Sequence, residues 1–213
     1  MIKGFIAGLI VANGFEWVAH KYILHGVHRT GQPRYSPVPR SMASHWAHHR
    51  EVKTQHFHDD CYVEGLASWR TRNELLSLGV VAATSMAIFA PLSKGMAIAA
   101  AYSAINYFYV HRKAHLQPDW AKRRIPWHVD HHMNANQDAN WCVTKPWFDY
   151  LLGTRVVSSP DLKEANPLGI WLPRTVSQRF THAVERLRPV KWTPTALTAT
   201  DCAHQQNRPR KVA

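Results

Sequence analysis

The feature that most constrains the fold is a 36-residue apolar stretch, Leu75–Val110, which carries a single charge, Lys94. In its middle, Pro91-Leu-Ser-Lys-Gly95 has the composition of a turn. The two halves, 75–90 and 96–110, would form helices of roughly 22–24 Å, so they need helical extension into their flanks to cross the roughly 30 Å hydrocarbon core of a bilayer. We predict a transmembrane helical hairpin. A buried hairpin in a soluble all-α protein is the alternative.

A second apolar segment begins the sequence, Ile2–Ala19, with Lys3 and Glu16 as its only charges. No small-residue cleavage site follows it, and it continues directly into a histidine motif. A membrane helix therefore fits this segment better than a signal peptide.

The distribution of charge supports this topology. The chain has 26 Lys and Arg against 14 Asp and Glu, a net charge of +12. Suppose that the 91–95 turn lies on one side of a membrane and the polar segments lie on the other. The polar segments then carry 24 basic residues, 8 in residues 20–74 and 16 in residues 111–213, and only Lys3 and Lys94 lie on the side of the turn. The positive-inside rule then predicts an integral membrane protein with a cytoplasmic catalytic face, in a bacterial inner membrane or in the endoplasmic reticulum. A basic surface near anionic headgroups accounts for the charge without a nucleic-acid partner.

Histidine is the most informative residue type, with 15 copies. Ten of them form four motifs, HxxxxH and HxxHH before the hairpin, then HxxxH and HxxHH after it: His20, His25, His45, His48, His49, His111, His115, His128, His131 and His132. About 0.07 copies of HxxHH are expected by chance at this composition. The three cysteines, Cys61, Cys142 and Cys202, are too far apart for a CxxC metal site and do not suggest a disulfide-stapled fold.

Helical geometry gives this spacing a meaning. Each HxxHH motif places its three imidazoles within an arc of about 100°, and the HxxxH pair lies one turn apart on one stripe. His20 and His25 lie about 140° apart on an ideal helix, so they would serve different metal ions or require a bent helix end. His28 falls between them on the wheel. Ten imidazoles suit two metal ions, and neutral imidazole binds iron and zinc among others.

Other metal sites fit less well. The sequence contains neither HExxH nor Glu-x-x-His, which argues against a zinc protease and a ferritin-like di-iron site. His56-Phe-His-Asp-Asp60 has the HxHxD spacing of metallo-β-lactamases, but that fold needs many strands and no strand pattern is visible. His28, His56, His58, His182 and His204, taken singly, are expected to be surface or core residues rather than ligands. An all-histidine dinuclear site in a membrane protein points to iron and O₂.

The four motifs in this order around a helical hairpin resemble the fatty acid hydroxylase superfamily, the integral-membrane di-iron hydroxylases of fatty acids and sphingolipids together with sterol desaturases and methyl oxidases. The resemblance covers about residues 16–155. It includes the stretch Asn140-Trp-Cys-Val-Thr-Lys-Pro-Trp-Phe-Asp-Tyr-Leu-Leu-Gly-Thr154 after the last motif. Ala19-His-Lys-Tyr-Ile-Leu-His-Gly26 is also similar to the first motif of bacterial β-carotene hydroxylases, but the HxxxH motif and the longer gap from His25 to His45 depart from them.

The resemblance implies an all-α membrane bundle with a histidine-rich cytoplasmic cap in residues 1–155. The polar composition of residues 156–213 predicts a cytoplasmic C-terminal extension that frays after about Thr193. The resemblance also implies that the ten patterned histidines hold two iron ions, which zinc could replace in a purified sample, and that the enzyme uses O₂ to hydroxylate a lipid acyl chain. A sterol desaturase or methyl oxidase, a carotenoid ring hydroxylase and a non-enzymatic membrane metal-binding scaffold are the alternatives. Electrons would come from a separate cytochrome or ferredoxin.

Two further sets of residues carry expectations. Glu16, one turn before His20, and Asp130, inside the last motif, are candidates to accept an imidazole N–H and fix its tautomer. Trp46, Trp127, Trp141 and Trp147 would line a substrate entrance or, more simply, form an interfacial aromatic belt. The sequence does not identify substrate-binding residues, the lipid or the position oxidised.

Overall fold

A computed structural model of the chain describes residues 1–27, residue 34 and residues 44–193. This part of the chain is mostly helical, as predicted. The elements in order are α1 (Ile2–Val18), η1 (Ala19–Leu24), α2 (Ser44–Thr54), α3 (Cys61–Glu64), η3 (Gly65–Ala67), α4 (Trp69–Phe89), α5 (Lys94–Leu116), α6 (Pro118–Arg124), α7 (Pro126–Met133), α8 (Trp147–Leu151), β1 (Val156–Val157), η4 (Pro160–Leu162), α9 (Arg174–Leu187) and β2 (Lys191–Trp192).

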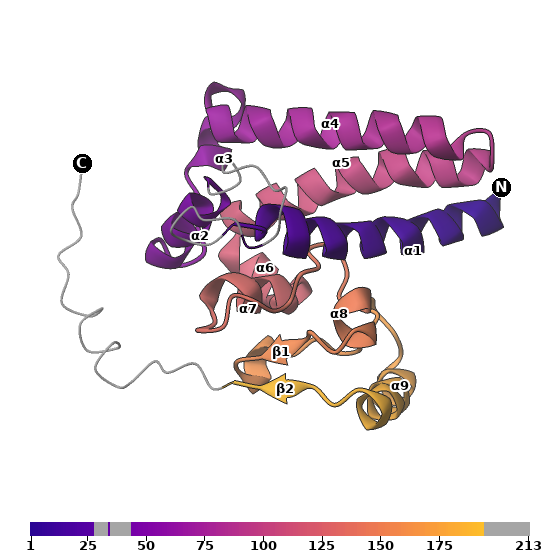
Figure 1. The fold of residues 1–213 in the computed structure, drawn as a ribbon. Coiled ribbons are helices and arrows are strands. Elements are labelled where there is room, and N and C mark those ends of the chain that lie inside the picture. The colour runs from indigo at the N-terminus through magenta and orange to yellow at the C-terminus, as the bar shows by residue number, and fades with distance from the viewer. Residues whose placement is uncertain (28–33, 35–43, 194–213) are drawn as a thin grey trace.

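Three long helices, α1, α4 and α5, run alongside one another (Figure 1). The predicted helical hairpin is confirmed as α4 and α5, joined at the predicted turn, where the Ser93 side chain caps α5 by accepting from the Met96 amide. Its helices are longer than the apolar halves alone, 21 and 23 residues, or about 31–35 Å. The expected extension into the flanks is therefore present.

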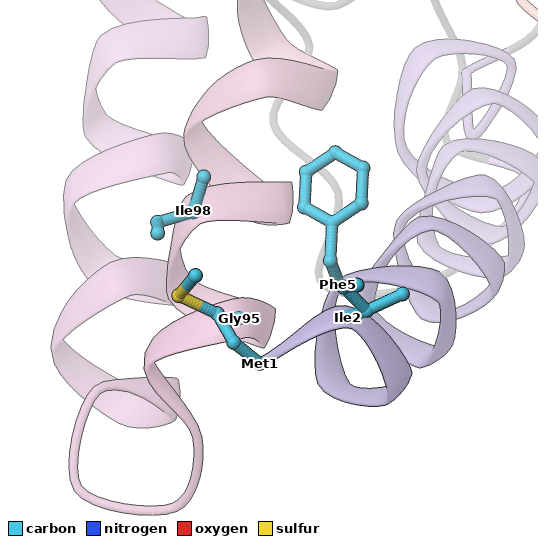
Figure 2. A pocket seen from close by; sticks show the side chains of 5 residues that line it. All are labelled: Met1, Ile2, Phe5, Gly95 and Ile98. Atoms are coloured by element: carbon cyan, nitrogen blue, oxygen red, sulfur yellow. The ribbon is translucent and has the colours of Figure 1, made fainter.

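Glycines let α1 and α5 approach closely. A Cβ on Gly8 would meet Ala99 and Met96, and one on Gly95 would meet the backbone of Met1 and Phe5. The N-terminus therefore lies beside the hairpin turn, so Lys3 and Lys94 share one end of the helices, as the charge distribution requires. Figure 2 shows an apolar pocket here, lined by Met1, Ile2, Phe5, Gly95 and Ile98, at the end opposite α2 and α7.

The long helices expose apolar side chains along their length. Large exposed examples, one or two from each helix, are Ile6, Ile10, Leu76, Val80 and Ile105. Among the residues that the structure describes, the continuous helix Ile2–Leu24 is the one long and apolar enough, by length and composition, to cross a membrane.

The opposite end of the bundle is a helical cap. Figure 1 shows α2, α3, α6 and α7 gathered there, where the long helices end. Its apolar core includes Trp127, Phe57, Val52 and Ile125. α6 and α7 each begin with a proline, whose missing N–H costs nothing at a helix start.

The C-terminal segment departs from an all-helical chain. β1 and β2 form a two-residue parallel pair in the described residues, with Val156 opposite Lys191. β1 and η4 both pack against α7. The start of this segment, residues 156–162, is therefore bound to the helix that carries the last HxxHH motif.

Candidate metal centre

Nine of the ten patterned histidines form two groups in which one potential ligand atom per residue lies within 4.8 Å of the others. We call them the first histidine group (His20, His25, His45, His49 and His131) and the second histidine group (His48, His111, His115 and His132). The tenth, His128, places its Nε2 atom 3.3 Å from that of His115, beside the second group. The structure thus brings nine of the ten patterned imidazoles into two groups that could each hold a metal ion, with His128 beside the second.

Distances within the first group match ligands around one ion. The Nε2 atom of His49 lies 3.1 Å from the Nε2 atoms of His25, His45 and His131. With metal–nitrogen bonds of about 2.1 Å, adjacent ligands lie about 3.0 Å apart at 90° and about 3.4 Å apart in a tetrahedron. One proton on His49 cannot satisfy three neighbouring nitrogens, whereas a single cation can.

Hydrogen bonds at Nδ1 fix the tautomers. His20 and His131 each face a backbone carbonyl, of Trp141 at 2.6 Å and of Ala139 at 2.7 Å, and His115 faces the carbonyl of Phe57 at 3.0 Å. Because a carbonyl only accepts, each Nδ1 must carry the proton, which leaves Nε2 with a lone pair for a metal.

Buried nitrogen atoms without partners point the same way. His48 Nε2 and both ring nitrogens of His132 are buried and have no hydrogen-bond partner in the described part of the chain. Such atoms are costly unless something unseen satisfies them. The donor set of the second group therefore fits a bound cation.

A π-helical turn explains how His20 and His25 reach the same group. Ala19–Leu24 is a π-helix, and the His25 amide donates to the His20 carbonyl at 2.9 Å, five residues back. This wider turn brings residues five apart onto one face, with the two rings 5.2 Å apart. The expectation that they serve different metal ions is wrong, and the alternative, a distorted helix end, is correct.

The two HxxHH motifs divide between the groups in complementary ways. From α2, His45 and His49 join the first group and His48 the second. From α7, His131 joins the first group, while His132 and the adjacent His128 lie at the second. In each motif the i,i+4 pair lies about 40° apart and the third histidine lies at the other edge of the same arc of about 100°, so one helix face serves two adjacent groups.

Three carboxylates near the imidazoles were not predicted. Asp59 Oδ2 accepts from His48 Nδ1 at 2.6 Å, Glu74 Oε1 accepts from His111 Nδ1 at 2.8 Å, and Asp138 lies 3.6 Å from His25 Nδ1. Burial alone would raise the pKa of Asp59, but the hydrogen bond with His48 lowers it to about 2. Pairs such as Glu74 and His111 are hard to predict because the two residues lie 37 positions apart in the sequence.

Replacing Asp59 with asparagine is expected to weaken metal binding at the second histidine group by about 10–100-fold, since the carboxylate no longer orients His48. Titration of the metal-free protein with a divalent ion, analysed with two binding sites, measures this affinity. Asp60→Asn is the matched control, because that neighbouring carboxylate is largely exposed and contacts His58 rather than a grouped histidine. Equal affinities in the two variants would exclude the role of Asp59.

The two predicted carboxylates have other partners. Glu16 accepts from the amides of Val143 and Thr144 and from the Thr144 hydroxyl. Asp130 pairs with Arg155 at 2.7 Å and accepts from Ser158. The prediction that they accept an imidazole N–H is therefore replaced by an indirect role: they hold the segments that carry the histidines and their carbonyl partners.

The stretch from Asn140 to Thr154 closes on itself around Asp149. This buried carboxylate accepts from the amides of Trp141 and Cys142 at 2.8 and 2.9 Å and from the Thr154 hydroxyl at 2.7 Å. Gly153 has a φ of 66°, a conformation that glycine adopts easily, and this allows the chain to turn back so that Thr154 reaches Asp149. The fold thereby fixes the Trp141 carbonyl that orients His20.

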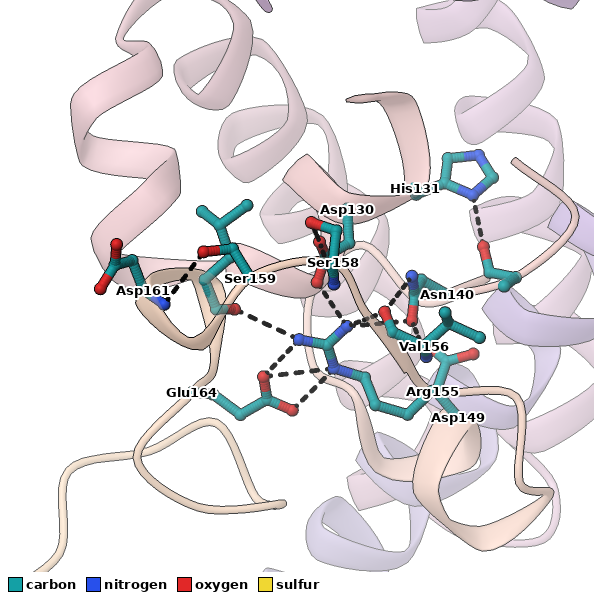
Figure 3. Close-up of polar contacts among 12 residues, drawn as sticks. Asp130, His131, Asn140, Asp149, Arg155, Val156, Ser158, Ser159, Asp161 and Glu164 are labelled. Carbon is teal, nitrogen blue, oxygen red and sulfur yellow. Dashed lines mark hydrogen bonds and ion pairs between the residues drawn. The ribbon is translucent and has the colours of Figure 1, made fainter. Parts of the chain in front are cut away.

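A buried charge network holds α7 (Figure 3). The guanidinium of Arg155 is almost fully buried and contacts Asp130, Glu164 at 2.7 Å and the Asn140 amide oxygen at 3.1 Å. Burial by itself would lower the pKa of Arg155, but the carboxylates of Glu164 and Asp130 raise it above its ordinary value. Asp130 lies between His128 and His131, so this network positions the last motif.

The four tryptophans do not form an interfacial belt. Trp46, Trp127 and Trp141 are buried. The ring of Trp141 packs against His25 at 4.9 Å and against His20 and His131 at slightly greater distance. Trp147 is half-buried and donates to the Leu168 carbonyl. Trp46 and Trp141 therefore pack against the first histidine group.

The remaining histidines lie apart from both groups or outside the described residues. His56 is exposed, and His58 pairs with Asp60. His182 is exposed on α9, whereas His28 and His204 lie outside the described residues. The loop that carries His56 and His58 nevertheless contacts the second histidine group. Its Phe57 carbonyl orients His115, and its Asp59 carboxylate orients His48.

The metal-free protein is expected to lose stability as the pH falls below about 6.5. Burial, reinforced by neighbouring imidazoles, lowers the pKa of His49, His131 and His132 well below that ordinary value. Below that pH the unfolded chain binds more protons than the folded chain, and this difference lowers the free energy of unfolding. Unfolding midpoints in detergent from pH 8 to pH 5 test this. A midpoint that stays constant or rises toward pH 5 would contradict it.

A pocket reaches the first histidine group from the surface. It is lined by Trp46, His49, Arg50, Lys53, Thr54 and Gln137. Arg50 and Lys53 place two exposed cations at its rim. The pocket therefore opens beside His49, a member of the first histidine group.

Comparison with known proteins identifies no relative: no family model, no curated protein and no solved structure matches this chain.

Proposed function

We propose that this chain is a membrane-bound di-iron oxygenase that uses O₂ to hydroxylate a lipid acyl chain. The observation that carries the proposal is the pair of adjacent, buried, all-imidazole groups at one end of three long helices with exposed apolar surfaces. The motif order that resembles the fatty acid hydroxylase superfamily adds the reaction class and the preference for iron over zinc.

The membrane location rests on the long helices. α1, α4 and α5 would cross the bilayer, with the N-terminus and the 91–95 turn on the far side and both histidine groups in the cytoplasm. Exposed apolar side chains such as Ile105 and Val80, 71% and 66% exposed, are unfavourable in water and suited to lipid. Both lysines assigned to the far side lie near the same end of the bundle.

Two iron ions bound by the histidine groups would supply the redox chemistry of the reaction R–H + O₂ + 2e⁻ + 2H⁺ → R–OH + H₂O. The protein contributes the environment. Nδ1 hydrogen bonds hold the imidazoles as neutral ligands, as for His20 and His131. Trp141 and Phe57 exclude water from the rings. The pocket at His49 gives access, and its basic rim suits an acidic electron-transfer protein of cytochrome or ferredoxin type.

The test is oxidation of lipid by the iron-loaded protein. We expect about two iron ions per chain, as the two groups require. With a reductant and ¹⁸O₂, mass spectrometry should show one labelled oxygen in an acyl chain. A labelled sterol or carotenoid would redirect the substrate class, and an acyl double bond would indicate desaturation. An iron-loaded, reduced protein that oxidises no lipid would instead favour a metal-binding scaffold.

A further inference from the structure

One buried tryptophan, Trp141, lacks an acceptor for its indole N–H. The structure describes four buried tryptophans, and in three of them the indole N–H donates to a protein oxygen at 2.6–3.0 Å: Trp17, Trp46 and Trp127. Trp141 is 3% exposed, and its Nε1 atom has no hydrogen-bond partner in the described part of the chain. A buried N–H without an acceptor is costly, so this atom points to an acceptor that the described residues do not supply.

The backbone of Trp141 is fixed on both sides of its Cα atom. Its amide donates to Asp149 Oδ1 at 2.8 Å, and its carbonyl accepts from His20 Nδ1 at 2.6 Å. The indole ring packs against the ring of His25, with the centroids 4.9 Å apart, and its centroid lies 5.7 Å from that of His131. The unpaired N–H therefore belongs to a ring that is held in place against the first histidine group.

The first histidine group leaves a position for one more ligand. It contains five imidazoles and no carboxylate. Five nitrogen ligands leave one position of an octahedral ion open. Neutral ligands do not offset the charge of a divalent ion, and an unpaired charge in a buried site is unfavourable. A small anion in the open position would offset this charge and would offer an acceptor to a neighbouring N–H donor.

The nearby pocket has the charge to attract such an anion. It opens beside His49, with exposed Arg50 and Lys53 at its rim. None of the residues that line it in the described part of the chain is acidic. The pocket therefore favours the entry of a small anion on the side of the first histidine group.

The aromatic neighbours of the second histidine group provide no comparable donor. Phe57 packs against His115 at 4.7 Å and carries no side-chain donor. Tyr62 stacks on the same imidazole at 5.8 Å, but its hydroxyl already donates to Glu74 Oε2 at 2.7 Å. This difference favours the first histidine group as the one that receives an external ligand.

We propose that the Trp141 indole N–H donates to a small anion bound at the metal ion of the first histidine group. The ligand class is a short anion with a nitrogen or oxygen donor atom, for which azide is a usable probe. The inference rests on the metal binding that the proposed function requires, and it does not depend on the oxidation of lipid.

Azide titration of the full chain, loaded with cobalt(II) in detergent and followed by the visible absorption of the metal, tests the role of the donor. Trp141→Phe removes the indole N–H and keeps an aromatic ring. Trp46→Phe is the matched control, because Trp46 packs on His25 at 4.5 Å and on His49 at 5.2 Å, but its N–H is bonded to a backbone carbonyl. The metal content of each variant is measured first.

A second measurement observes the donor itself. In the zinc-loaded chain with ¹⁵N-labelled tryptophan, the indole signal that is missing from the Trp141→Phe spectrum belongs to Trp141. Azide should move the proton of this signal downfield, because the N–H gains a charged acceptor. The Trp46 signal, assigned in the same way, should move much less.

We expect Trp141→Phe to keep the metal content of the unchanged protein and to bind azide about ten-fold or more weakly, whereas Trp46→Phe binds azide as the unchanged protein does. Equal azide affinity in all three proteins, with the Trp141 signal unmoved, would overturn the inference and leave the proposed function standing. If Trp141→Phe loses metal, the response of the Trp141 signal in the unchanged protein decides the question alone. A chain that binds no metal would overturn both the inference and the proposed function.

Discussion

Replacing His48 with alanine is expected to reduce the metal content from about two ions per chain to about one, and replacing its neighbour His49 is expected to remove the other ion. The two residues are adjacent on α2 but belong to different histidine groups. Each substitution takes one nitrogen from a buried site whose other ligands are all neutral imidazoles. Elemental analysis, with binding titration of each variant, measures the loss.

The contrast between these neighbours is the decisive measurement. The combined variant should hold no tightly bound metal, and O₂-dependent turnover should be abolished in all three. His58→Ala is the control, because His58 pairs with Asp60 and belongs to neither group. Full loss of both ions from His48→Ala alone would mean that the groups form one cooperative site. Loss of metal from His58→Ala would show that the division into ligands and bystanders is wrong.

Replacing Arg155 with alanine is expected to lower the free energy of unfolding by about 3–5 kcal/mol, because it leaves the buried carboxylates of Asp130 and Glu164 unpaired. Both histidine groups should lose affinity for metal, since α7 contributes His131 to one and His132 to the other. Chemical denaturation in detergent and metal titration measure the two effects.

Two comparisons separate this network from general surface charge. Lys122→Ala removes an exposed partner of Asp119 and should change neither stability nor metal content. Arg155→Lys keeps the charge but loses the two-pronged contact with Glu164, so it should be intermediate. An Arg155→Ala protein as stable as the Lys122→Ala protein would show that the network does not hold α7.

Much of the site could be read from the sequence because its ligands are repeated at helical spacing. The i,i+3,i+4 pattern of each HxxHH motif requires the imidazoles to share a face once the segment is helical, and both segments are helical. The hairpin was predictable for a similar reason, since an apolar run with a proline–glycine turn in its middle has few ways to fold. Both features depend on local backbone geometry, which can be predicted from residue spacing in the sequence.

The sequence by itself determined that ten histidines gather at one end of a helical bundle, and the tertiary structure alone decided how they divide and what orients them. His20 and His25 share a group because the helix widens into a π turn, a change that spacing on an ideal helix cannot show. Asp59 and Glu74 orient His48 and His111, whereas Glu16 and Asp130, closer in sequence to a motif, bind other segments. The physical reason is that a hydrogen bond depends on where two helices meet in space, and that meeting is set by packing across the whole cap.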